Sequence, residues 1–436
     1  MHAYQIGRFL GWYYASERFG CFDPNYKPKI VIGKDTRRSS YMLEYSLAAG
    51  LVASGADAYM LHVTTTPSVS YVTKNDAFDC GIMITASHNP YFDNGIKIIN
   101  GNGEKADDKL LSLIESYLDG NTDELPWATR EKIGCIVDYS AGRNRYIAYL
   151  IALASHSYKH LHIGLDCANG ASFAIAKAVF SALGAQVEAI GTDPDGMNVN
   201  RDCGSTHTEQ LSRLVKEKNL DVGFAFDGDA DRCIAIDEKG NVVDGDRILY
   251  ILSKRFHERG MLENNTVVST VMSNSGLSSS LWSEGIFCRQ TTVGDRFVYE
   301  CMTENGYALG GEPSGHIIMK KYATTGDGIL TAIMLTEELC DKKSVFSQLS
   351  ESITLYPQYV ENLKVTDKEA AMTDCAVNQV KNKIETEIEK KGRLLLRKSG
   401  TESVIRILVE CESEKKCKEY AFEIASVIKE RGYIIE

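Results

Sequence analysis

The chain has 436 residues, of which 44% are hydrophobic and 25% charged, a composition typical of a globular protein with about three domains. The net charge of −11, without a strongly basic block, argues against nucleic acid as a partner, although a phosphorylated small molecule needs only a local basic pocket. The beginning of the sequence does not resemble a signal peptide, and the longest apolar stretch, 146–154, is too short to span a membrane.

The twelve cysteines include no Cys-x-x-Cys pair. The two closest, Cys411 and Cys417, have a spacing that suits neither zinc nor a redox motif. We therefore expect reduced thiols in a cytoplasmic protein. From the charge and the short apolar stretches, we expect neither a nucleic-acid nor a membrane partner.

The first block, 1–134, begins with an amphipathic helix, because Ile6, Phe9, Leu10, Tyr13 and Tyr14 fall on one helical face. Strands are then predicted at 29–33, 58–63, 81–84 and 95–99, and helices at 41–54, 68–74 and 107–118. Such alternation predicts a mainly parallel sheet covered by helices.

Two further blocks, 135–240 and 241–354, have the same rhythm. In the second block we predict strands at 160–165, 186–190 and 222–226, and helices at 143–154, 172–183 and 209–218. In the third we predict strands at 266–270 and 308–310, and helices at 247–259, 276–284, 295–304 and 326–339. The similar rhythm indicates repeated α/β domains.

The last block, 355–436, has a different pattern. A long charged helix at 367–390 precedes strands at 394–396 and 404–410, and a helix at 414–431 ends the chain. The predicted fold is therefore α/β, with three similar mixed, mainly parallel domains and a C-terminal α+β domain.

Three aspartates, Asp227, Asp229 and Asp231, follow the apolar strand at 222–226. Their spacing matches the first ligands of an EF-hand, but Arg232 replaces the glycine that the calcium loop requires, and strands flank the loop. Carboxylates crowded in this way repel one another unless a cation or Arg232 compensates, and we favour the cation. The sequence therefore predicts a magnesium site.

The segment Thr85–Pro90 follows another apolar strand and contains Ser87, His88 and Asn89. A serine held at the end of a strand can carry or donate a phosphoryl group, and His88 and Asn89 can donate hydrogen bonds to its oxygens. Lys97 lies close enough in the sequence to return to the same pocket as an acid, a base or a positive charge.

A glycine-rich segment, Gly310–His316, holds Glu312, Ser314 and His316. In an extended loop Glu312 and Ser314 share a face, where they could bind sugar hydroxyls. His316 is a candidate general acid or base. A plain tight turn is an equally good interpretation of this segment taken alone.

The segment Arg397–Ser403 joins two predicted strands of the last block. A guanidinium group, hydroxyls and backbone amides together make a phosphate cradle. The residues that would form it are Arg397, Ser399, Gly400, Thr401 and, from the following strand, Arg406.

These four segments, in this order, resemble the motifs of the α-D-phosphohexomutase superfamily over nearly the whole chain. The resemblance implies four domains around a central cleft, with one Mg²⁺ held by Ser87, Asp227, Asp229 and Asp231. It also implies that Ser87 carries the phosphoryl group, that Glu312 and Ser314 bind the sugar, and that the Arg397 loop binds the substrate's phosphate. Arg37 and Arg232 are expected to assist the transfer.

Within the superfamily, the segments 203–207, 293–297 and 324–328 resemble those of bacterial phosphoglucosamine mutases. This implies a phosphorylated hexosamine substrate, with glucosamine 1,6-bisphosphate as intermediate and activator. The sequence leaves open whether the protein is a monomer or a homodimer. The chain departs from the pattern at Pro313 and Ser403, and the family's N-terminal strand and glycine-rich Arg-Gly segment are expected before the first helix but are missing.

Three alternatives remain open on sequence alone. One is a phosphomannomutase/phosphoglucomutase that acts on neutral sugars. The second is a magnesium-dependent phosphatase, in which water replaces the sugar as acceptor. The third is a non-catalytic protein that binds phosphosugars.

Overall fold

A computed structural model describes residues 1–16, 20, 23, 26–121, 124–388, 392–398 and 403–435. The chain divides into two compact units, the first formed by residues 1–272 and 286–351 and the second by residues 273–285 and 352–436. None of the described helices is long and apolar enough to cross a membrane.

The first sheet of the first unit is mixed and mainly parallel. Its strands are β1 (Lys29–Lys34), β2 (Asp57–Val63), β3 (Cys80–Ile84), β4 (Ile96–Asn100) and β5 (Ile136–Asp138), in the order β4-β3-β1-β2-β5. Only the β3–β4 pair in this sheet is antiparallel. Because β5 pairs with β2, the sheet continues beyond residue 134, where we expected the first domain to end.

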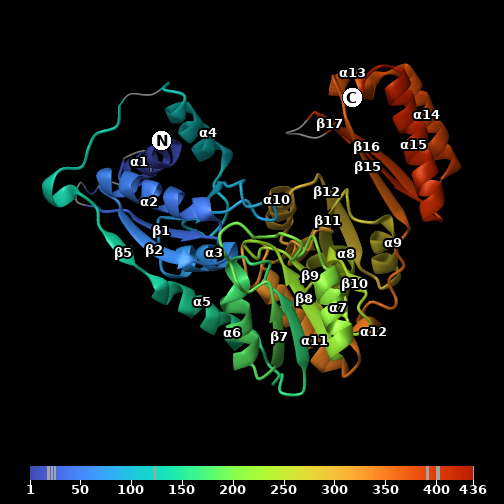
Figure 1. Cartoon of the computed structure of the whole chain (residues 1–436), viewed down its shortest axis with the longest axis horizontal. Coiled ribbons are helices and arrows are strands. Elements are labelled where there is room, and N and C mark those ends of the chain that lie inside the picture. Colours follow the sequence, from blue (N-terminus) through green and yellow to red (C-terminus); the bar gives the residue numbers. More distant parts are fainter. Residues whose placement is uncertain are drawn as a thin grey trace. The chain divides into compact units, whose positions relative to one another are not determined.

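Four helices accompany this sheet: α1 (His2–Tyr14), α2 (Arg38–Ala53), α3 (Thr66–Asn75) and α4 (Asp108–Leu118). Helices α1 and α2 lie side by side (Figure 1). A Cβ atom on Gly7 would lie 2.3 Å from the carbonyl oxygen of Leu47, and one on Gly50 would lie 2.2 Å from that of Tyr4. The close approach of the two helices therefore requires these glycines.

The second sheet has the order β10-β9-β8-β6-β7 and contains the acidic loop between β8 and β9. Its strands are β6 (His162–Asp166), β7 (Gln186–Ile190), β8 (Val222–Phe226), β9 (Cys233–Asp237) and β10 (Val242–Val243), and its helices are α5 (Ser140–Leu153), α6 (Ile175–Ala182) and α7 (Glu209–Lys218). Strands β7, β6 and β8 are parallel, whereas β9 is antiparallel to β8. The strands on both sides of the loop confirm that it is not an EF-hand.

The third sheet has the order β12-β11-β13-β14, with β14 antiparallel to β13. Its strands are β11 (Thr266–Thr270), β12 (Phe287–Thr291), β13 (Leu309–Gly311) and β14 (Ile317–Met319); the nearby helices in the chain are α8 (Gly245–Glu258), α10 (Asp295–Asn305), α11 (Gly328–Lys342) and α12 (Phe346–Leu349). The sequence did not predict β12 or β14. The three mixed sheets confirm the predicted α/β class.

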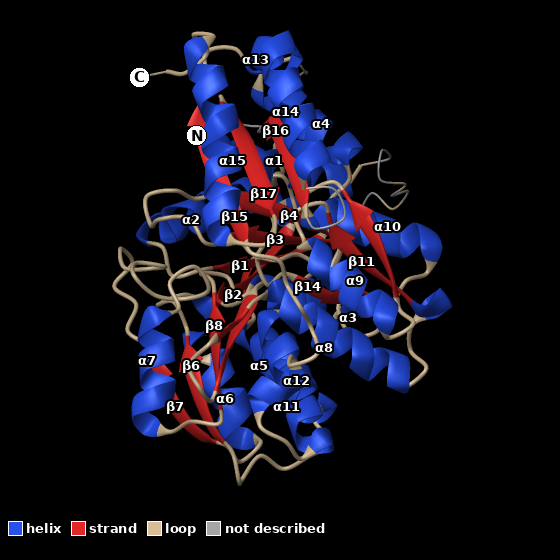
Figure 2. Ribbon diagram, turned by 90° about the vertical axis from the view of Figure 1, so that its right-hand side faces the viewer, coloured by secondary structure: helices blue, strands red, loops and turns tan. Residues whose placement is uncertain are grey.

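The second unit contains the residues of the predicted α+β block, 355–436, together with 273–285, which we had assigned to the third block. It comprises α9 (Ser275–Ser283), β15 (Gln358–Lys364), α13 (Lys368–Thr373), α14 (Cys375–Glu387), β16 (Arg393–Lys398), β17 (Val404–Glu410) and α15 (Glu414–Glu430). Its antiparallel sheet, β15-β17-β16, packs against α14 and α15 (Figure 2). Ile405, Ile407 and Val409 of β17 form a core with Ala421 and Ile424 of α15.

The single helix predicted at 367–390 is wrong. Asp374 leaves the helical conformation with φ −61° and ψ 132°, and its carboxylate accepts hydrogen bonds from Ala376 N at 2.8 Å and Val377 N at 3.3 Å. It thereby ends α13 and caps α14, which is the role that aspartate favours at a helix N-terminus.

Asp327 caps α11 inside the protein. Its carboxylate accepts hydrogen bonds from Leu330 N at 2.9 Å and from the Tyr146 hydroxyl at 2.8 Å. Burial raises the pKa of Asp327 from 3.8 to about 6. The folded protein therefore binds this proton more tightly than the unfolded chain does, so the contribution to stability is full below pH 3.8 and is lost as the pH rises through about 6.

We predict that Asp327→Asn removes this dependence, because asparagine stays neutral and still caps the helix. Between pH 4 and pH 7 the free energy of unfolding of the variant should rise relative to the parent by up to about 3 kcal/mol. Urea denaturation across this range tests it, with the exposed Asp193→Asn as control. A constant difference between Asp327→Asn and the parent would contradict the prediction.

Candidate active site

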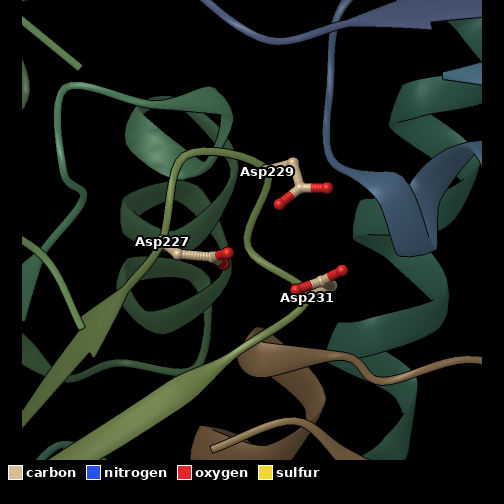
Figure 3. A group of neighbouring side chains, drawn as sticks. All are labelled: Asp227, Asp229 and Asp231. Atoms are coloured by element: carbon tan, nitrogen blue, oxygen red, sulfur yellow. The ribbon is translucent and has the colours of Figure 1, made fainter. Parts of the chain in front are cut away.

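The acidic loop brings three carboxylates together inside the first unit. Asp227, Asp229 and Asp231 are all buried, and one ligand atom from each lies within 4.8 Å of the others. Figure 3 shows the three side chains on the short loop between β8 and β9. Burial, followed by the charges of Asp231 and Asp229, raises the pKa of Asp227 well above its usual value.

The donor set fits a hard divalent cation. Mg²⁺ takes oxygen ligands, usually one or two carboxylates together with phosphate and water oxygens, and this loop offers three carboxylates. Oδ1 of Asp229 is buried and has no hydrogen-bond partner among the described residues. An unpartnered buried carboxylate oxygen is costly, and a bound cation would satisfy it.

Positive charge from β4 offsets part of the carboxylate charge. Nζ of Lys97 lies 2.6 Å from Oδ2 of Asp229 and 3.0 Å from Oδ2 of Asp231. Although burial opposes the charge of the ammonium group, these two carboxylates raise the pKa of Lys97. Burial by itself would raise the pKa of Asp231, but Lys97 and His316 hold this pKa well below its usual value.

Ser87 lies directly beside the acidic loop. Its hydroxyl donates a hydrogen bond of 2.6 Å to Oδ2 of Asp227. The residue has a φ of 52°, in the left-handed region that serine rarely adopts, and its N–H donates to Oγ1 of Thr85 at 2.9 Å. A strained backbone at a reactive side chain is typical of functional sites, where the surroundings hold the conformation.

Arg37 provides much of that hold. It is fully buried, and its Nη2 donates to the carbonyl oxygens of Ser87 at 2.9 Å and Asn89 at 2.8 Å, while its Nε pairs with Asp35 at 2.8 Å. Asn200 donates to the same two carbonyls, at 2.8 and 3.0 Å. We expected Arg37 to assist the transfer; the structure places it behind the Ser87 loop, where it acts as a positioning residue.

Arg232 and His88 meet beside the acidic loop. Nη1 of Arg232 lies 3.0 Å from Nδ1 of His88, and Nε of Arg232 lies 4.0 Å from Asp227 and 3.9 Å from Asp231. Because a guanidinium group can only donate, Nδ1 of His88 accepts, and the ring is neutral in this arrangement.

The glycine-rich segment forms a turn, which is the second of the two interpretations that the sequence left open. The N–H of Gly315 donates to the carbonyl oxygen of Glu312 at 3.0 Å. Gly315 has a φ of 87°, and a Cβ atom there would lie 2.2 Å from the carbonyl oxygen of Cys233. Glu312 accepts from Gly294 N at 3.1 Å, and the buried Oγ of Ser314 has no hydrogen-bond partner among the described residues.

His316 lies between two carboxylates. Its Nδ1 is 3.5 Å from Oδ1 of Asp231, and its Nε2 is 3.4 Å from Oδ2 of Asp295. Burial alone would lower the pKa of His316, but these two carboxylates raise it above its usual value. When the ring is neutral its proton lies on Nδ1, since Gly326 N donates to Nε2 at 3.1 Å.

Several of these groups line one cleft of about 470 Å³. The site residues that line it are Ser87, Lys97, Asp231, Arg232, Asp295, Glu312, Ser314 and His316. The cleft thus holds a hydroxyl nucleophile, ammonium and guanidinium groups and hydroxyl-binding groups, which together suit the transfer of a phosphoryl group to a sugar.

The second unit brings together Arg397 and Arg406, which are direct partners across β16 and β17. Burial, followed by the charge of Arg406, lowers the pKa of Arg397. Two like charges side by side favour a bound anion between them. Ser399, Gly400 and Thr401, the other members of the predicted phosphate cradle, lie outside the described residues.

Sequence analysis missed three residues that shape this site. Thr66, at the start of α3, donates from its hydroxyl to Oδ2 of Asp229. Asn200 supports the Ser87 loop, and Asp295 faces both His316 and Lys105. Asp295 lies in a segment that resembles phosphoglucosamine mutases, so that resemblance could have indicated it.

Family models match four successive parts of the chain. Those described as phosphoglucomutase/phosphomannomutase alpha/beta/alpha domains I, II and III match residues 1–124, 144–240 and 244–359, and the C-terminal domain matches residues 361–427. The chain is 55% identical over 434 residues to a phosphoglucosamine mutase of Lachnospira eligens, covering 100% of this chain and 95% of that protein. It is 54% identical to the phosphoglucosamine mutase of Lachnoclostridium phytofermentans, with 99% and 95% covered.

Solved structures share the fold. A phosphoglucomutase/phosphomannomutase family protein of Burkholderia thailandensis has a TM-score of 0.80 at 22% identity, over 98% of this chain and 93% of that one. The N-acetylphosphoglucosamine mutase of Aspergillus fumigatus, in complex with GlcNAc-6P and magnesium, has a TM-score of 0.67 at 17% identity, over 85% and 93%.

We predict that Arg37→Met destabilises the protein, because it leaves buried Asp35 and several carbonyl oxygens without their partner. The free energy of unfolding should fall by about 3–5 kcal/mol. The exposed neighbour Arg38→Met is the matched control and should change it by less than about 0.5 kcal/mol. Equal effects of the two variants in urea denaturation would contradict the role of Arg37 in holding the loop.

We predict that Asp229→Asn weakens magnesium binding roughly tenfold or more, because it removes one charged ligand from the acidic loop. Isothermal titration calorimetry with Mg²⁺ measures this directly. The exposed Glu217→Gln on α7 controls for a general change in charge and should bind as the parent does. An unchanged affinity in Asp229→Asn would show that the ion binds elsewhere.

Proposed function

Since the chain belongs to the phosphoglucomutase/phosphomannomutase family and is a phosphohexomutase, we propose that it interconverts glucosamine 6-phosphate and glucosamine 1-phosphate. The observation that carries the chemistry is the Ser87 hydroxyl, 2.6 Å from buried Asp227 at the edge of the cleft. In the proposed active form this oxygen bears a phosphoryl group.

The reaction consists of two transfers in opposite directions. In the first, the bond between phosphorus and Oγ of Ser87 breaks as a free hydroxyl oxygen of the sugar bonds to the phosphorus, giving glucosamine 1,6-bisphosphate. The hydroxyl proton passes to a base of the cleft. The bisphosphate then turns around. Oγ of Ser87 bonds to the other phosphorus as the bond between that phosphorus and the sugar oxygen breaks, and the proton held in the cleft returns to the freed sugar oxygen, so that Ser87 again bears phosphate.

Charge in the cleft stabilises both transfers. Mg²⁺, held by Asp227, Asp229, Asp231 and an oxygen at Ser87, would neutralise charge on the phosphoryl group. Arg232 adds a positive charge beside Asp227. Lys97 is protonated and donates hydrogen bonds to the carboxylates of the acidic loop. Proton transfer is assigned to Lys97 and His316.

The remaining groups hold the sugar. Glu312 and the unpartnered hydroxyl of Ser314 bind sugar hydroxyls at the wall of the cleft. Arg397 and Arg406 bind the phosphate that is not being transferred, together with Ser399, Gly400 and Thr401. This division leaves one phosphate fixed while the other reacts, in either orientation of the substrate.

The identity of 55% with a phosphoglucosamine mutase favours the amino sugar over mannose or glucose phosphates. Pro313 lies in the sugar-binding turn and is the reason to test all three sugars. The assembled serine and acidic loop support a catalyst over a protein that only binds phosphosugars. The match to all four family domains supports a mutase over a phosphatase.

We predict that Ser87→Ala loses at least about a thousandfold in turnover of glucosamine 6-phosphate, because the group that carries the phosphoryl is absent. A loop hydroxyl contributes little packing, so the free energy of unfolding should change by less than about 1 kcal/mol. A coupled assay for glucosamine 1-phosphate measures the first, and urea denaturation the second.

Ser112→Ala, on the exposed side of α4, is the matched control and should keep full activity. Activity of Ser87→Ala close to that of the control would refute the proposed mechanism. Faster conversion of mannose or glucose phosphates by the parent would favour the neutral-sugar alternative, and release of inorganic phosphate without isomer formation would favour a phosphatase.

A further inference from the structure

Two cysteine thiols meet in the core of the second unit. Sγ of Cys411, just after β17, lies 3.0 Å from Sγ of Cys417 in the first turn of α15. Both side chains are buried, with 2% and 0% of their surface exposed. A disulfide bond has a length of about 2.05 Å. Small side-chain rotations that shorten the distance between the sulfurs by about 1 Å would therefore bring them to bonding distance.

The surroundings hold the two sulfurs in this position. Strand β17 and helix α15 pack on the same core through Val409 and Ala421. Sγ of Cys417 donates to the carbonyl oxygen of Pro357 at 3.3 Å, and N of Cys411 donates to the same oxygen at 3.2 Å. Both cysteines therefore border elements that pack on one core, with their sulfurs directed toward each other.

We propose that Cys411 and Cys417 form a reversible disulfide when the protein meets a small-molecule disulfide, and that this bond stiffens the connection between β17 and α15. A thiolate of the pair attacks the small disulfide, whose S–S bond breaks and releases one thiol. The second protein thiol then displaces the attached half. One protein S–S bond forms, two electrons pass to the small disulfide, and two protons leave with its two thiols.

The reaction is slow, as the environment requires. Burial, followed by Cys411, raises the pKa of Cys417 to about 12, so that little thiolate is present at neutral pH. The intervening residues, including exposed Glu412 and Glu414, form a short surface connection whose local opening gives the small disulfide access. The same burial protects the bond once it has formed.

The bond acts away from the proposed phosphate-binding residues. In the hairpin of β16 and β17, Arg393 pairs with Glu410 beside Cys411, whereas Arg397 pairs with Arg406 toward the opposite end. The oxidised protein should therefore keep its turnover. The second unit is small, so its hydrophobic core alone provides limited stability. A cross-link would add to that stability by constraining the unfolded chain.

The test uses the full-length protein incubated with oxidised glutathione, blocked with N-ethylmaleimide and digested. We expect the peptides with Cys411 and Cys417 to be joined, lighter by two hydrogen atoms and unlabelled, and dithiothreitol to restore two labelled thiols. Hydrogen–deuterium exchange of amides 411–417 should slow several-fold in the oxidised protein. Both changes should vanish in Cys411→Ser and persist in the control Cys301→Ser, on α10.

Three results would overturn the proposal. One is labelling of both thiols after the oxidant. Another is a lasting glutathione adduct on either cysteine, or a bond to a different cysteine. The third is a joined pair whose amides exchange as fast as in the reduced protein. The first two are read in the parent protein and need no variant to fold.

Discussion

Three carboxylates buried within one loop impose the electrostatic constraint on which the rest of the site depends. Asp227, Asp229 and Asp231 would repel one another strongly in a low dielectric unless positive charge and hydrogen-bond donors surrounded them. Lys97 comes from β4 and Thr66 from α3, and both reach the same carboxylate from the first sheet. The first and second sheets therefore meet at the acidic loop, and the Ser87 hydroxyl is held beside it.

The Ser87 loop is rigid for a related reason. Its positive φ angle is unfavourable, and Arg37 and Asn200 hold the loop through its carbonyl oxygens from behind. A Cβ atom on Gly228 would lie 2.6 Å from the carbonyl oxygen of Ser87, so the close approach of the acidic loop to the Ser87 loop requires glycine at this position. Phosphoryl transfer depends mainly on positioning and charge, and the site supplies both before substrate arrives.

The sequence predicted the parts of the fold and site that carry strong local signals. Apolar runs that end in polar loops placed Ser87 and the three aspartates at strand ends, and four motifs in order indicated the family. Strand β12 escaped prediction because Phe287–Thr291 is half exposed and includes Arg289 and Gln290. The interruption at Asp374 escaped prediction because residues that favour helix, such as Ala371 and Ala376, lie on both sides of it.

Other features carry no local signal at all. Asn200 and Thr66 are single polar residues whose partners lie far away in the chain, so only the folded structure reveals them. The role of Arg37 in holding the Ser87 loop is a further example, because its guanidinium group donates to Asp35 and to backbone carbonyls of residues far away in the chain. The contact between Cys411 and Cys417 arises because a strand end and a helix start meet in three dimensions.

The most direct measurement follows the phosphoryl group itself. Protein that carries ³²P-labelled phosphate on Ser87 is mixed with unlabelled glucosamine 6-phosphate and quenched within a single turnover. We expect that label leaves Ser87, appears in the sugar phosphates, and is replaced on Ser87 by unlabelled phosphate. Label that stays on Ser87 while product forms, or that leaves only as inorganic phosphate, would contradict this expectation.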